Sequence, residues 1–291
     1  MIIEWSDPGV EAVREGAETY AERYPEYADA LRLYGAIMEV QQSALESISC
    51  PLEPLSPEEV ESRLLSGEPL LDPGALDIDG PAYRRVLADV CSAVVENAPE
   101  AFTLGEELLA WEGLSDERLP ETRDLVLEGR DIDFKPAKNL SERDRKLVTD
   151  LLWEGLAPFY RVCGRILASK MEQSIWQRGY CPVCGGAPLI GLYQEEDGLW
   201  VVECSLCHTG WNVQRAACPF CTGSQGSLEY IYIEDDKTRR ANYCRACKKY
   251  VKTVDSRDSG EALLLPLEDI VTADLDLAAR DEGLTPATGR S

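Results

Sequence analysis

Apolar residues recur at helical spacing through the first 175 residues of the chain. Residues 27–47 place one set on a single face of a helix, and a second helix is expected from Pro81, because proline suits the first turn of a helix. The first stripe comprises Tyr27, Leu31, Tyr34, Met38 and Leu45, and the second comprises Tyr83, Val86, Leu87, Val90, Cys91 and Val94. The pattern predicts a helical N-terminal region.

A further helix is expected to begin after Ser141, a residue type common at N-caps, with Asp144 in its first turn. Pro158 should kink or restart this helix, because proline has no N–H group to donate within a helix. Beyond Pro158, apolar residues again recur at steps of three and four: Phe159, Val162, Cys163, Ile166, Leu167, Met171 and Ile175.

The pattern changes after Trp176. Short runs typical of β-strands appear at 199–204 and 228–235, with glycine-containing turns between them. A helix is expected again at 267–282, and the tail at 283–291 is expected to be frayed. The order of elements predicts an α+β protein in which a helical region precedes a β-rich one.

The composition is that of a chain able to fill its own core, with 44% hydrophobic residues in 291. The N-terminus lacks the basic segment and apolar run of a signal peptide. The longest apolar stretches, such as 262–267, are far too short to span a membrane. We therefore expect a soluble, cytoplasmic protein with no membrane insertion.

The net charge of −24 is unevenly distributed. Residues 1–134 carry 31 acidic residues against nine arginines and no lysine, whereas 135–291 carry 22 acidic and 20 basic residues. Such an acidic surface repels nucleic acid and anionic membranes. It is either a solvated face or a docking surface for a basic segment of a partner.

Eight of the eleven cysteines form four Cys-x2-Cys pairs between residues 181 and 247. In a reducing cytoplasm such pairs indicate metal ligands or redox thiols and not structural disulfides. Cys91 and Cys163 lie inside apolar stripes, where a free cysteine packs as a small hydrophobic residue. Cys50 precedes a proline-rich connection at 51–60, and the sequence assigns it no role.

The spacing of the four pairs indicates two four-cysteine metal sites. The intervals between successive pairs are 19, 10 and 22 residues, and "CPVC" and "CPFC" open what looks like an internal duplication. This order favours pairing the first with the second and the third with the fourth, although crossed pairing is an alternative. Two such turns on adjacent hairpins can present a tetrahedron of thiolates, which suits Zn²⁺ or a single iron ion.

Other residues near the cysteines have a structural and a functional interpretation. His208 could replace a cysteine ligand, but we expect a surface or supporting position for it, because four cysteines are available. The nearby aromatic residues are expected to form small cores around the sites, with electron transfer or ligand stacking as the alternative. They are Tyr180, Trp200, Trp211, Tyr230, Tyr232, Tyr243 and Tyr250.

Residues 237–252 contain seven basic residues and no acidic one. Compensation of thiolate charge, contact with a protein partner and contact with nucleic acid each account for such a stretch. Its bases are Lys237, Arg239, Arg240, Arg245, Lys248, Lys249 and Lys252.

Taken together, these motifs resemble the formate dehydrogenase accessory protein family, FdhE. The resemblance is strongest over 180–283 and rests on "CPVCGGAP", "ECSLCHTGW", "VQRAACPFC", "YCRACKKYVK" and "LEDIVTADLDLAARDEG". It implies a helical domain at 1–177, a rubredoxin-like or zinc-ribbon module at 178–215, and a second module with a C-terminal helix at 216–291. The implied ligands are Cys181, Cys184, Cys204 and Cys207 for one ion of iron or zinc, and Cys218, Cys221, Cys244 and Cys247 for the other.

The resemblance also implies a function. Members of the family are cytoplasmic maturation factors that act on the catalytic subunit of formate dehydrogenase, so we expect that subunit as the partner and no enzymatic activity. The alternatives are a rubredoxin-like electron carrier and, less favoured, a nucleic-acid-binding zinc ribbon. No glycine-rich phosphate loop is evident, and a catalytic Cys/His pair would have to use His208.

Overall fold

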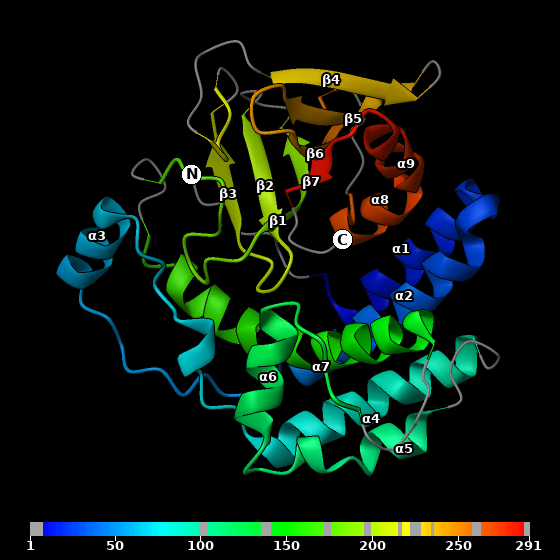
Figure 1. Cartoon of the computed structure of the whole chain (residues 1–291), viewed down its shortest axis with the longest axis vertical. Coiled ribbons are helices and arrows are strands. Elements are labelled where there is room, and N and C mark those ends of the chain that lie inside the picture. Colours follow the sequence, from blue (N-terminus) through cyan, green and yellow to red (C-terminus); the bar gives the residue numbers. More distant parts are fainter. Residues whose placement is uncertain are drawn as a thin grey trace. The chain divides into compact units, whose positions relative to one another are not determined.

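The computed structural model describes most of the chain (Figure 1). The described residues are 8–98, 104–134, 141–171, 176–194, 199–214, 217–221, 228–233, 236–257 and 263–287. They form two compact units, each built from segments that are not consecutive in the sequence. The helical unit comprises Asp7–Glu53 and Asp72–Cys163, and the cysteine unit contains Pro54–Leu71 and Gly164–Ser291. The division of the sequence at 177/178 and 215/216 follows its motifs and stays a prediction.

The helical unit consists of α-helices joined by short 3-10 turns. Its helices are α1 (Val10–Arg23), α2 (Ala28–Ala44), α4 (Gly80–Asn97), α5 (Gly105–Leu109), α6 (Leu119–Leu127) and most of α7 (Glu142–Ala168), with 3-10 turns at Pro25–Tyr27, Pro73–Ala75 and Glu112–Leu114. The predicted stripes of α2 and α4 supply the core, in which Leu31, Leu87 and Val90 are fully buried. Helical periodicity therefore located these two helices correctly.

Helix α7 confirms one prediction and corrects two. Ser141 caps its first turn, because the Asp144 N–H donates to the Ser141 Oγ at 3.1 Å. Of the kink or restart expected at Pro158, the restart is wrong, since α7 continues through this proline to Ala168. Ile166 is also not part of a buried stripe, because its side chain is 46% exposed. Ile175, the last member of that stripe, lies outside the described residues.

The proline-rich connection contains a helix that periodicity missed. Helix α3 (Pro57–Ser66) begins with a capping box, in which Ser56 Oγ accepts from the Glu59 N–H and Glu59 Oε2 accepts from the Ser56 N–H. Pro57 occupies the first turn, and Gly67 ends the helix with φ of 84°. The motif Ser-Pro-Glu-Glu was the available sequence signal for this helix.

The predicted modules share one mixed β-sheet. Its strands are β1 (Pro188–Tyr193), β2 (Trp200–Cys204), β3 (Gly210–Val213), β4 (Leu228–Ile233), β5 (Asp236–Cys244), β6 (Lys249–Asp255) and β7 (Thr285–Pro286). The order is β3-β2-β1-β6-β5-β4, and β7 pairs with β6. Strands β1 and β6 run parallel and join the two halves, with Gly191 opposite Thr253. The α+β class is therefore confirmed, and one cysteine pair of each half begins at the end of a strand, Cys204 on β2 and Cys244 on β5.

The C-terminal segment packs on this sheet as two helices, not the single one expected. They are α8 (Leu265–Val271) and α9 (Ala273–Asp281), separated at Thr272, whose Oγ1 donates to the Glu268 carbonyl (Figure 1). Leu265 packs against β1 and β6, and Leu275 and Ala279 pack against β5 and β6. The tail is not frayed through residue 287, because the Thr285 N–H donates to the Lys248 carbonyl at 2.9 Å. Residues 288–291 lie outside the described part.

Cys50 and Cys163 form a disulfide within the helical unit, with their Cα atoms 5.2 Å apart. The expectation for Cys163 is thus half right: its side chain is buried, but it is bonded and not free. Cys91 is free and buried, as expected. None of the helices in the described part of the chain combines the length and the apolar character needed to cross a bilayer.

Candidate metal centres

The structure gathers the eight paired cysteines into two groups of four. The first group is Cys181, Cys184, Cys204 and Cys207, and the second is Cys218, Cys221, Cys244 and Cys247. Within each group the sulfur atoms all lie within 4.8 Å of one another. Consecutive pairs thus come together, as the internal duplication favoured. We call these groups the first and second four-cysteine sites.

The turn that holds each pair follows from its backbone. In the turns that begin at Cys181, Cys204 and Cys218, the N–H two residues later donates to the sulfur of that cysteine at 3.4 Å; the donors are Val183, Leu206 and Phe220. The residue after the second cysteine has a left-handed backbone at Gly185, His208 and Lys248, with φ of 73°, 55° and 61°. The turn requires a left-handed backbone at this position. Glycine adopts that conformation readily, as Gly185 does after "CPVC", whereas His208 and Lys248 adopt it at an energetic cost.

The sulfur positions fit a tetrahedral metal ion. With metal–sulfur bonds of about 2.3 Å, the edge of a sulfur tetrahedron is about 3.8 Å long. The sulfurs of Cys218 and Cys247 lie 3.7 Å apart, as do those of Cys221 and Cys244. In the first site the corresponding distances are 3.5 Å for Cys181 to Cys207 and 3.4 Å for Cys184 to Cys204. The donor set, four soft thiolates with no carboxylate, suits zinc or iron.

The electrostatics of the sites also favour a cation. Burial raises the pKa of the Cys181 and Cys218 thiols, because a buried thiolate loses its hydration. A bound divalent ion offsets that loss, since it binds the thiolate directly and releases the proton. The burial of these cysteines is thus compatible with thiolate ligands when a cation is present.

His208 belongs to neither group of possible ligands among the described residues. Its Nδ1 lies 2.6 Å from Oε1 of Glu203, and both side chains are largely buried. The expectation of a supporting position fits this geometry. His208 closes the turn after Cys207 and ties it to β2.

The aromatic residues only partly form cores. Trp200, Trp211 and Tyr250 are at most 2% exposed, and Tyr180 donates its hydroxyl to the Gly67 carbonyl at 2.8 Å. For Tyr230 and Tyr232 the expected burial is wrong, since these side chains are 45% and 39% exposed. Both lie on β4, the edge strand of the sheet, whose alternation places them away from the α9 side.

The basic stretch at 237–252 is largely compensated by acids of this chain. Four of its seven bases form ion pairs: Arg239 with Glu268, Arg240 with Asp255, Arg245 with Glu229, and Lys252 with Asp269 and Asp276. Among the described residues, no ion pair joins Lys237, Lys248 or Lys249 to an acid. The stretch is therefore not one continuous cationic surface.

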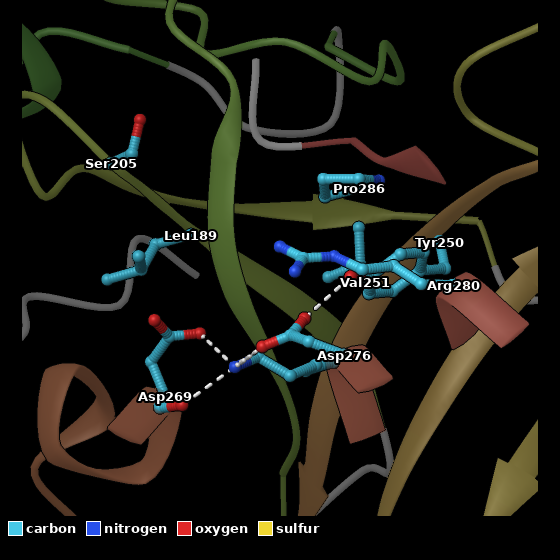
Figure 2. Close-up of a pocket in the computed structure, with 9 residues that line it drawn as sticks. Leu189, Ser205, Tyr250, Val251, Asp269, Asp276, Arg280 and Pro286 are labelled. Carbon is cyan, nitrogen blue, oxygen red and sulfur yellow. Dashed lines mark hydrogen bonds and ion pairs between the residues drawn. The ribbon is translucent and has the colours of Figure 1, made fainter. Parts of the chain in front are cut away.

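Lys252 lines a small pocket, and Figure 2 shows Asp269 and Asp276, the two acids of that pocket that pair with it. Its Nζ lies 2.8 Å from Asp269 Oδ1 and 2.7 Å from Asp276 Oδ2, and Tyr250 donates its hydroxyl to Asp276 Oδ1 at 2.6 Å. The pocket has a volume of about 160 Å³, and its wall includes Ser205 of the second turn of the first site. The buried ammonium group of Lys252 thereby links β6 to α8 and α9.

Comparison with known proteins identifies relatives of this arrangement. The family model for the central domain of FdhE matches residues 180–215, which hold the first four-cysteine site. A protein FdhE homologue from Aquifex aeolicus is 26% identical over 271 residues, covering 90% of this chain and 87% of the relative. Protein FdhE of Escherichia coli is 26% identical over 259 residues, covering 88% of this chain and 78% of the relative.

One solved structure supports the fold. The crystal structure of the FdhE protein from Pseudomonas aeruginosa matches with a TM-score of 0.62 at 23% identity, covering 97% of this chain and 95% of that one. The similarity extends over the helical and the β-rich parts of the chain.

Proposed function

We propose that this chain, which belongs to the FdhE family, is an accessory protein for the formation of formate dehydrogenase. It binds the catalytic subunit of that enzyme in the cytoplasm during maturation, and it catalyses no reaction itself. Each four-cysteine site holds one ion of iron or zinc. The observation that supports the proposal most directly is the pair of tetrahedral cysteine groups within one sheet.

The metal ions give the partner-binding unit its shape. Each ion joins two turns that are far apart in the sequence, and small β-rich regions of this kind depend on such cross-links for stability. Removal of one thiolate leaves the ion with only three of its four ligands. The loss of either site therefore disturbs the sheet that both halves share.

A strain of the native host that lacks this protein tests the function. The wild-type chain should restore formate dehydrogenase activity, and the Cys181→Ser and Cys218→Ser variants should not. The matched control is Cys91→Ala, which removes a free buried cysteine outside both sites. Full restoration by a chain carrying both serine substitutions would overturn the role of the metal sites.

The partner is tested separately, with purified catalytic subunit immobilised in its unassembled form. The wild-type chain should be retained, and a chain with both serine substitutions should be retained weakly or not at all. If neither protein is retained, the catalytic subunit is excluded as the partner. The proposal that the chain binds metal is not affected by that result.

An electron carrier is the second candidate, because two cysteines of the second site, Cys221 and Cys247, are partly exposed. Electron transfer to a partner requires a metal close to the surface, and this site provides it. The candidate demands iron and a reversible one-electron reduction. Stoichiometric zinc in protein purified from the native host without added metal would exclude it.

A further inference from the structure

We infer that the two four-cysteine sites are not equivalent: the first releases its ion slowly, and the second is the site at which a metal ion readily enters, leaves and is exchanged with outside ligands. This inference rests on the proposed binding of metal at both sites. It does not depend on the identity of the partner.

The four cysteines of the first site are buried, so the site is closed to solvent. Cys181 and Cys204 are 0% exposed, Cys184 is 2% exposed and Cys207 is 3% exposed. A ligand that replaces a thiolate on zinc must first approach the metal, which expands to five-coordinate as the ligand enters. No sulfur of this site offers a path for that approach.

A segment from much earlier in the chain covers the first turn of this site. The Leu70 N–H donates to the Pro182 carbonyl at 3.0 Å, and the Leu71 N–H donates to the Val183 carbonyl at 2.7 Å. Leu70, Leu71 and Val183 are all buried. Opening the first turn therefore requires the loss of backbone hydrogen bonds and of apolar burial together.

Two glycines show how tightly the remaining sides are filled. A Cβ on Gly186 would lie 3.0 Å from the Cys204 sulfur and 3.2 Å from the Cys184 sulfur. A Cβ on Gly164, in α7, would lie 3.1 Å from the Cys207 carbonyl oxygen. Where a methyl group does not fit without displacement, a chelator has no room either.

The second site is open along one edge. Cys218 and Cys244 are buried, whereas Cys221 and Cys247 are partly exposed. These two partly exposed cysteines belong to opposite turns, and their sulfurs lie within 4.8 Å of each other. The turn between Cys218 and Cys221 is covered at Pro219, since a Cβ on Gly179 would lie 2.8 Å from the Pro219 carbonyl oxygen. The partly exposed Cys221 and Cys247 thus give an incoming ligand its route to this site.

The charges beside this edge favour anionic ligands. A divalent ion with four thiolates carries a formal charge of −2, which repels an approaching anion. Lys248 and Lys249 directly follow Cys247, are exposed, and have no ion pair with a described residue. Their charges lower that repulsion, and salt should screen their effect.

The inference is tested on the full chain loaded with two zinc ions, with stoichiometry established first by metal analysis. Metal release into EDTA, an anionic chelator, should occur in two phases of equal amplitude. Alkylation with iodoacetamide during the fast phase, followed by peptide mass spectrometry, should label Cys221 and Cys247 at least about tenfold faster than the cysteines of the first site, because thiol modification follows exposure. Equal rates, or faster labelling of the first site, would overturn the inference.

A ligand-preserving variant avoids dependence on cysteine substitutions that unfold the chain. Lys248→Glu/Lys249→Glu should slow the fast phase in EDTA by about tenfold at low salt, and by less at high salt. Release into the neutral chelator 1,10-phenanthroline should not change. If the variant slows metal release into both chelators equally, the fold of the site has changed, and the argument that Lys248 and Lys249 attract anionic ligands is overturned. A chain that binds no metal would overturn the metal premise itself, whereas failure to bind the formate dehydrogenase subunit would leave this result untouched.

Discussion

The side-chain amide of Gln41 donates a hydrogen bond of 3.0 Å to the main-chain carbonyl of Glu154, four residues before Pro158 in α7. That carbonyl would otherwise accept the N–H of residue 158, which proline does not have. Gln41 also donates to the Glu154 carboxylate at 2.7 Å. A side chain from α2 thus donates to the carbonyl that proline leaves without its usual helical donor, and α7 continues through Pro158.

Replacement of this donor should destabilise the helical unit. Gln41→Leu removes both hydrogen bonds that Gln41 donates to the buried Glu154, and should lower the free energy of unfolding by about 1–3 kcal/mol. Urea unfolding measures the change. In a Pro158→Ala background the cost should be smaller, because alanine supplies the missing N–H. Equal costs in the two backgrounds would show that Gln41 does not compensate for the proline.

The disulfide between Cys50 and Cys163 should stabilise the oxidised chain. It spans a sequence separation of 113 residues. A loop of that size restricts the unfolded chain enough to contribute at most about 4–5 kcal/mol. Cys50→Ala, at a partly exposed position, should lower the free energy of unfolding under non-reducing conditions, whereas the cost of Cys91→Ala relative to the wild-type chain should be the same in oxidising and reducing buffers. Alkylation of Cys50 in the untreated native protein would contradict the disulfide.

The left-handed backbone after Cys184 should make glycine necessary there. Gly185→Ala is expected to cost about 1–2 kcal/mol, because a Cβ is disfavoured at positive φ. The same Cβ would also lie 3.1 Å from Pro69 Cγ. The converse change, Lys248→Gly, should be neutral or stabilising, since lysine already occupies that backbone conformation. Thermal unfolding of the metal-loaded proteins distinguishes the two, and a stabilising Gly185→Ala would refute the argument.

The network around Lys252 should hold α8 and α9 on the sheet. Lys252→Met removes the ammonium group that contacts Asp269 and Asp276 and should cost about 2–4 kcal/mol, near the lower end for a buried pair because both carboxylates are partly exposed. Adding Asp276→Asn should recover part of the loss. Lys249→Met, on the same strand but exposed, is the matched control and should change stability by less than about 0.5 kcal/mol. Hydrogen exchange should locate the effect in α8 and α9.

Tyr250 should make the chain sensitive to alkali. Burial, together with the hydrogen bond to Asp276, raises the pKa of Tyr250 in the folded state. The folded chain therefore retains this proton where the unfolded chain loses it, so stability falls as the pH rises above about 10, by up to about 1.4 kcal/mol per pH unit. Tyr250→Phe should reduce that slope, while Tyr83, whose pKa burial also raises, keeps its own contribution in both proteins. Identical slopes would contradict the assignment.

The two four-cysteine sites were predictable from local sequence because their chemistry is local. A Cys-x2-Cys turn presents both sulfurs to one side, and the duplicated order of "CPVC" and "CPFC" indicates which turns meet. The helices α2 and α4 were predictable for a similar reason, since their apolar stripes have the helical period. The start of α3 was also encoded locally, in the capping box of Ser56 and Glu59, although its surroundings suggested a loop.

Tertiary structure decided what depends on residues far apart in the chain. Pro158 is tolerated because Gln41, more than a hundred residues away, supplies the missing donor. Cys50 meets Cys163 only after the helices pack, so periodicity indicated burial but not the bond. The difference between the sites has the same origin: their cysteine motifs are alike, but Leu70 and Leu71 cover the first site, whereas Cys221 and Cys247 of the second remain exposed.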